Sequence, residues 1–183
     1  MNKIEEITDF IKEEEIDIAF ISESHDRENK RLGDHMKLSD HITISNIYQR
    51  SSNVKGGRPA IIANKKKYII ENLTNTSVTI PWGVEITWAL LTPKNVTRDS
   101  TIQKIVLGAV YMKPNSKKKT TLLDHIAEVH ASLGAKYGRG LHWIITGDTN
   151  DLKLGPILEI NQNFKNQQDQ TQRIQKRVQF LIT

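Results

Sequence analysis

The chain has 183 residues, a formal net charge of +5, 37% hydrophobic and 26% charged residues, and no cysteine. This composition predicts one soluble globular domain over residues 1–183, and the lack of cysteine excludes disulfides, thiolate zinc sites and a cysteine nucleophile. No apolar run approaches the roughly 20 residues of a membrane span. The acidic start, MNKIEEITDF, also lacks the features of a secretory signal. We therefore expect an intracellular protein with no membrane partner.

The first half of the chain is predicted to begin with a helix and to continue mainly as strands. Ile4, Ile7 and Ile11 recur at the spacing of an amphipathic helix. The apolar run Ile16–Ile21 is typical of a buried strand, and residues 26–40 of a polar loop or a loop with a helical turn. Further strands are expected at His41–Tyr48, Ala60–Ala63, Tyr68–Leu73 and Val84–Leu91, with a turn at Gly56-Gly57.

The second half alternates strands with helices. Strands are expected at Ile105–Tyr111, His142–Thr146 and Val178–Ile182, and a short helix from Gly155 to Ile160. The clearest helix is Thr120–Leu133, whose apolar residues form one stripe and which Gly134 is expected to cap. Helices inserted between strands predict an α/β (α+β) fold, with a mixed sheet or two sheets packed together.

Two apolar strands end at acidic residues, Glu23 and Asp148. If the two strands lie side by side, these carboxylates converge and repel unless a cation joins them, and hard oxygen ligands with open water positions suit Mg²⁺. Gly147 would let the backbone approach closely, and Asn150 can donate a hydrogen bond to a phosphate. Acids at strand ends also commonly form turns or cap helices, so the spacing alone leaves both interpretations open.

Four segments, in order along the chain, resemble motifs of the endonuclease/exonuclease/phosphatase (DNase-I-like) superfamily. Phe20–His25 is similar to its Q-E-[ST]-H stretch, Lys55–Asn64 to its Gly-Gly strand, Val110–Pro114 to V-Y-x-x-P, and Ile145–Asn150 to G-D-F-N. The likeness is closest to the endonuclease domain of non-LTR retroelements, whose tail is echoed by Thr171–Arg173 and Val178–Thr183. The resemblance implies a DNase-I-like two-layer β-sandwich flanked by helices.

The resemblance also implies an activity, a divalent-metal-dependent endonuclease that hydrolyses DNA with Mg²⁺ or Mn²⁺. In that interpretation Glu23 binds the metal, and Asp148 orients or deprotonates the attacking water. Asn150 holds the scissile phosphate, and Tyr111 lies near that phosphate to stabilise developing charge. A retroelement protein of this kind would work in the nucleus.

Other residues could contact the substrate. His25 follows Glu23 by two residues, so it could touch DNA or simply lie in a surface loop. Lys113 adds positive charge beside the Tyr111 segment. The runs Lys65–Lys67 and Lys117–Lys119 could bind phosphates or serve solubility alone.

Several residues that could carry chemistry are assigned structural roles. The three tryptophans could stack on bases, but Trp88 and Trp143 fall in apolar strands and are expected in the core. His125 and His130 lie five apart on a predicted helix without an H-E-x-x-H pattern, which argues against a zinc site.

The sequence departs from the family pattern at both ends. The family's first strand, which carries an Asn, has no counterpart, and its Leu-Asp is Val178-Gln179 here. The histidine-bearing segment would lie beyond Thr183. We therefore expect a fold truncated at both ends with an incomplete active site. The alternatives are a catalytically impaired remnant that binds nucleic acid or protein, a phosphatase of the same superfamily, and an interaction module that self-associates through unpaired sheet edges.

Overall fold

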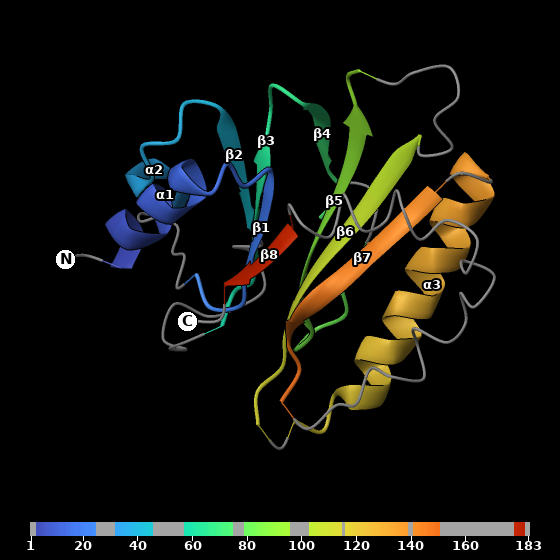
Figure 1. Cartoon of the computed structure of the whole chain (residues 1–183). Helices are drawn as coiled ribbons and strands as arrows, with labels where there is room; N and C mark the ends of the chain where they lie inside the picture. Colours follow the sequence, from blue (N-terminus) through green and yellow to red (C-terminus); the bar gives the residue numbers. More distant parts are fainter. Residues whose placement is uncertain are drawn as a thin grey trace.

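Two β-sheets pack against each other and carry helices on their outer faces in the computed structural model of the chain (Figure 1). It describes residues 3–24, 32–45, 57–74, 79–95, 103–114, 116–138 and 141–150, and the backbone of 178–181. The described elements are α1 Lys3–Glu13, β1 Ile18–Ile21, α2 Leu32–His35, β2 His41–Ser45, β3 Ala60–Asn64, β4 Tyr68–Asn72, β5 Glu85–Pro93, β6 Lys104–Tyr111, α3 Lys119–Tyr137, β7 Leu141–Asp148 and β8 Val178–Leu181.

Each sheet has four described strands. The first sheet has the order β2-β3-β1-β8 and the second the order β4-β5-β6-β7. Strand β1 runs antiparallel to β3 and parallel to β8, and β6 runs antiparallel to β5 and parallel to β7. A parallel pair needs a long crossover, which α3 supplies between β6 and β7. The predicted mixed α/β class with two packed sheets is confirmed.

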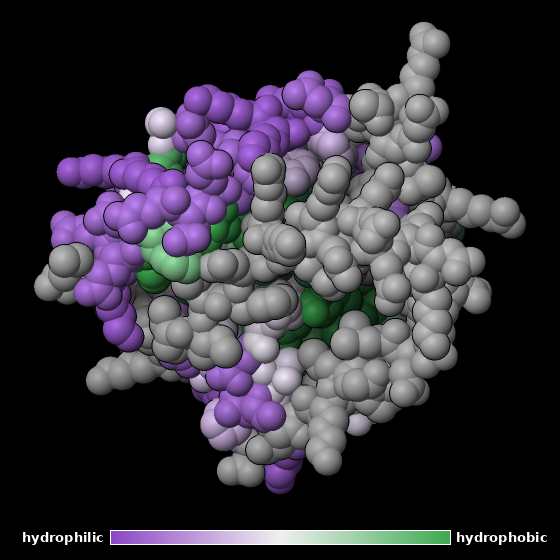
Figure 2. Space-filling model, viewed as in Figure 1, coloured by the Kyte–Doolittle hydropathy of each residue, from purple (hydrophilic) through white to green (hydrophobic). Residues whose placement is uncertain are grey.

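The core has three layers of apolar contacts. Side chains such as Phe20 of β1 and Leu107 of β6 meet between the sheets. Trp88 of β5 packs with the apolar stripe of α3 on the outer face of the second sheet. Ile11 of α1 and Leu32 of α2 cover the outer face of the first. On the face shown in Figure 2, hydrophilic residues gather over α1 and α2, as expected for the solvent side of this layer.

Most predicted boundaries agree with the structure to within a few residues, and the end of α3 is the main exception. Gly134 lies inside the helix, which continues to Tyr137 and is capped by Gly138. The N–H of Gly138 donates to the carbonyl of Gly134 over 2.9 Å. The extra turn lets Tyr137 pack against the core. The predicted helix from Gly155 to Ile160 lies outside the described residues.

A buried histidine joins α3 to the second sheet. His125 is 2% exposed and Trp88 is 0% exposed. The indole N–H of Trp88 donates to Nε2 of His125 over 3.1 Å. Because an indole N–H can only donate, this Nε2 is unprotonated and the ring is neutral, with its proton on Nδ1. Trp143 meets Trp88 edge-on at 6.3 Å and is partly buried, so both tryptophans belong to the core, as predicted.

This pair predicts a loss of stability in mild acid. Burial lowers the pKa of His125 below its ordinary 6.5, an effect that Glu128 partly opposes. The unfolded chain therefore takes up the proton first, and as pH falls below 6.5 stability should drop by at most about 1.4 kcal/mol per pH unit. Urea unfolding of the wild type and of His125→Gln, which keeps an acceptor for Trp88, should show a weaker pH dependence in the variant. Equal pH dependence would contradict this prediction.

Candidate functional site

The predicted site residues that the structure describes lie at one end of the two sheets, where β1, β6 and β7 finish and β3 and β5 begin. We call this the lower end, from its place in Figure 1. The sequence expectation allowed β1 and β7 to lie side by side. They are instead in different sheets, because β1 pairs with β3 and β8 whereas β7 pairs with β6. The two strands contact each other across the interface between the sheets.

Three polar side chains form one row at the lower end of the second sheet. Glu85 of β5 is the register partner of Tyr111 of β6, and Tyr111 is the partner of Asp148 of β7. These residues alternate in phase with Thr87, Ala109 and Ile144, which places the row on the face that meets the first sheet. Each of the three is half-buried. Two carboxyl groups thus flank a phenol at the rim of the interface between the sheets.

A chain of hydrogen bonds links this row to the end of β1. The backbone N–H and the hydroxyl of Ser24 both donate to the carbonyl of Arg58, over 3.1 and 2.6 Å. The N–H of Arg58 donates to Oε2 of Glu85 over 3.0 Å. A Cβ added to Gly57 would stand 2.1 Å from that Oε2 and 2.9 Å from Cδ1 of Tyr111. Residues from both sheets therefore meet around Glu85 and Tyr111.

The segment after β7 is fixed by its own side chains. The backbone N–H of Asn150 donates to Oδ1 of Asp148 over 3.0 Å, and its side-chain amide donates to the carbonyl of Met112 over 2.5 Å. The N–H of Met112 in turn donates to the carbonyl of Asp148 over 2.8 Å. Asn150 has a φ of +47°, a conformation that asparagine tolerates better than most residues. The carboxylate and the amide are thus held in a defined relation to the end of β6.

The remaining predicted residues divide between described and undescribed parts of the chain. Glu23 is half-buried at the end of β1, directly before Ser24, and Lys113 is exposed two residues after Tyr111. His25 lies outside the described residues. Gln179 is described by its backbone, which pairs with Ala19 of β1. In the described part of the chain, no three His, Asp or Glu side chains are grouped to hold a metal ion.

Sequence reasoning missed Glu85 and Arg58. Glu85 begins a strand whose next residues are apolar, and a polar residue in phase with Thr87 on a face otherwise buried is the signal that could have identified it. Arg58 gives a weaker signal. It is buried and has a φ of +67°, a strained backbone conformation for a residue with a side chain. This conformation cannot be predicted from the sequence.

Removal of the Glu85 acceptor should loosen the lower end. Glu85→Ala leaves the N–H of Arg58 without this partner, at a cost of about 1–3 kcal/mol in unfolding free energy, whereas Glu85→Gln keeps an oxygen acceptor and should cost less. Urea unfolding of both variants measures the difference. Equal unfolding free energies of the two variants would show that this hydrogen bond does not stabilise the lower end.

The two lysine runs lie at opposite ends of the fold. Lys65–Lys67 connects β3 to β4, away from the lower end. There Lys66 pairs with Asp40 at 2.7 Å and Lys67 with the buried Asp17 at 2.6 Å. The structure therefore assigns these two lysines to ion pairs, and it places the run away from the predicted site residues. Lys117–Lys119 lies at the lower end, where α3 begins.

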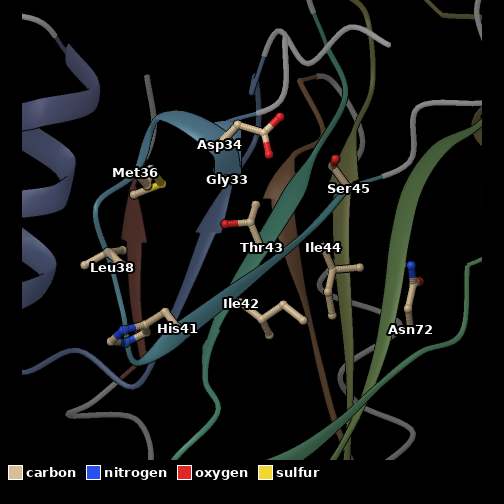
Figure 3. A pocket seen from close by; sticks show the side chains of 10 residues that line it. All are labelled: Gly33, Asp34, Met36, Leu38, His41, Ile42, Thr43, Ile44, Ser45 and Asn72. Carbon is tan, nitrogen blue, oxygen red and sulfur yellow. The ribbon is translucent and has the colours of Figure 1, made fainter. Parts of the chain in front are cut away.

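Two hollows among the described residues lie elsewhere. One, of about 340 Å³, runs between α2, β2 and Asn72 (Figure 3). In Figure 3, Asp34 and Thr43 lie near each other, and Ile42 and Ile44 point to the opposite side of β2. The other, of about 420 Å³, lies around Asp17, Asp40 and Lys67. Neither contains a sequence-predicted site residue, and in the second hollow Asp17 and Asp40 are already paired with lysines.

Comparison with known proteins adds no family assignment. No protein-family model matches the chain, and the search of curated proteins likewise finds no match. Among the described helices, none combines the length and the apolar character that a bilayer crossing requires.

Proposed function

We propose that the chain is a divalent-metal-dependent DNA endonuclease whose active site lies at the lower end of the two sheets. The observation that carries this proposal is the row of Glu85, Tyr111 and Asp148 beside the end of β1. Tyr111 and Asp148 come from separate family-like motifs, and the bonds of Ser24 and Arg58 tie the motif that contains Glu23 to the same place.

The architecture supports the same proposal at the level of the fold. Two packed sheets with helices on both outer faces are what the DNase-I-like resemblance implies. Within that fold, we infer that the active site lies where family-like segments end their strands. The fold class alone would also suit a phosphatase or a binding module, so the proposal depends on the residues of the site.

The side chains of the site have complementary roles in this proposal. Asp148 orients the attacking water and takes up its proton, and its Oδ1 is held by the N–H of Asn150. The amide of Asn150 has two N–H groups, of which one bonds Met112 and the other is directed to a phosphate oxygen. The phenol of Tyr111 donates to the phosphate as negative charge develops on its oxygens.

The donor set at the end of β1 fits Mg²⁺ better than a metal that needs a full cage of protein ligands. Glu23 is a half-buried carboxylate. The hydroxyl of Ser22, the residue before it in the chain, is buried and lacks a hydrogen-bond partner among the described residues. Mg²⁺ commonly takes one or two carboxylates and completes its shell with water and substrate phosphate. When bound, it would neutralise charge on the phosphate; Glu23 is the residue proposed to hold it.

Nicking of supercoiled plasmid by the purified chain tests this proposal. Metal-dependent nicking that EDTA abolishes would support the endonuclease. A folded protein that leaves the plasmid intact but hydrolyses a small phosphate ester would favour the phosphatase alternative. A folded protein that does neither would identify an impaired remnant, for which Gln179, at the position of a family aspartate, would be the first explanation.

A further inference from the structure

We propose that Trp82 and Lys118 form a nucleotide-binding subsite that stacks on an unpaired base of DNA beside the candidate active site. The inference takes DNA as the ligand from the proposed function, but it does not depend on cleavage. The subsite would give the protein a preference for DNA with unpaired bases, which the active-site residues do not supply.

A tight turn projects Trp82 from the protein. The N–H of Val84 donates to the carbonyl of Pro81 over 3.1 Å, which closes a turn with Trp82 and Gly83 at its tip. Gly83 has a φ of +82°, the value that a type II turn requires at its third position and that glycine adopts without strain. The turn therefore places Trp82 at its second position, where the residue is 82% exposed.

This exposure distinguishes Trp82 from the other two tryptophans. Trp88 is fully buried, and Trp143 packs against the same core cluster. The ammonium group of Lys118 lies 5.7 Å from the centre of the Trp82 ring, within range of a cation–π contact. An exposed aromatic face beside a positive charge is the combination with which proteins hold single-stranded nucleic acid, since the ring stacks on a base and the cation attracts its phosphate.

The turn also lies next to the proposed active site. Glu85, three residues after Trp82, begins β5 and is the register partner of Tyr111. Lys118 belongs to the segment that leaves Tyr111 and enters α3, and the exposed Lys113 and Lys117 lie in that segment too. A strand whose phosphate reaches Tyr111 and Asp148 would thus have a basic segment and a free indole within the same end of the fold.

Titration with single-stranded oligo(dT), without metal and in EDTA, tests the subsite directly. A base stacked on Trp82 should quench its fluorescence, and Trp82→Ala should weaken binding about 5- to 100-fold, as expected for the loss of one base–aromatic stack. Trp82→Phe should retain part of the affinity. An abasic strand of the same length keeps the phosphates but offers nothing to stack, so wild type and Trp82→Ala should bind it equally.

Lys118→Gln measures the contribution of the lysine charge to DNA binding separately from that of the Trp82 ring. It should reduce the slope of log K against log salt by about 0.7, the contribution of one phosphate contact on a single strand. Ile69→Ala, at another exposed apolar residue, and Lys37→Gln, at another exposed lysine, are the matched controls and should bind as the wild type does.

Two results would overturn the subsite: oligo(dT) binding that Trp82→Ala leaves unchanged, or equal affinity of the wild type for oligo(dT) and the abasic strand. Because metal is absent, these results are independent of plasmid nicking. Loss of nicking with retained base-dependent binding would defeat the endonuclease proposal alone. Nicking without base-dependent binding would defeat the subsite alone.

Discussion

Asp148→Asn should slow metal-dependent plasmid nicking by about 10²- to 10⁴-fold, the usual contribution of a positioned general base. Asparagine is nearly isosteric with aspartate, and its side-chain oxygen can still accept the N–H of Asn150. The turn after β7 should therefore persist while the group that takes up the proton is lost. Initial nicking rates at saturating Mg²⁺ give the measurement.

Asp9→Asn is the matched control for this substitution. It makes the same chemical change at an exposed position of α1, on the outer face of the first sheet, and should nick as the wild type does. Urea unfolding should give similar midpoints for both variants. Undiminished nicking by a folded Asp148→Asn protein would remove Asp148 from the proposed chemistry.

Gly147→Ala should destabilise the protein by about 3 kcal/mol or more, since backbone strain and a steric collision act together. Gly147 has a φ of +140°, and an added Cβ would stand 1.9 Å from the carbonyl oxygen of Val110, its register partner in β6. Backbone atoms of a paired strand cannot yield as a flexible side chain can. The substitution should therefore push β7 away from β6 directly before Asp148.

Gly134→Ala is the contrasting glycine substitution. Gly134 lies inside α3, and an added Cβ there meets no atom within 4 Å. Alanine should raise stability by about 0.5–1 kcal/mol, because it loses less conformational freedom than glycine in a helix. Urea denaturation of the two variants should shift the midpoint in opposite directions. A mild effect of Gly147→Ala would mean that the junction of β6 and β7 is looser than its geometry indicates.

Strands and helices with clear periodicity could be predicted from the sequence. Ile4, Ile7 and Ile11 of α1 face the core cluster of the first sheet, as their spacing indicated. The end of α3 could not be placed, because Gly134 has the residue type of a helix cap and only the packing of Tyr137 extends the helix past it. Local propensity is weak compared with such tertiary contacts.

The candidate site shows the same division. The position of Asp148 at a strand end follows from the apolar run before it, and Tyr111 was singled out by its resemblance to a family motif. The register that places the two side by side was not predicted. Glu85 and Arg58 could not be found in this way, since their roles depend on a hydrogen bond between the two sheets. The sequence pattern also could not predict that β1 and β7 belong to different sheets, because strand pairing depends on contacts between distant parts of the chain.

The most direct test of the central claim is a double-substitution cycle of nicking rates with Glu23→Gln, Asp148→Asn and both together. Residues that act as one catalytic unit have strongly non-additive effects. If the end of β1 and the end of β7 form one active site, the double variant should nick about as slowly as the slower single variant. Losses that multiply, or a folded wild type that does not nick plasmid with Mg²⁺ at all, would contradict the account.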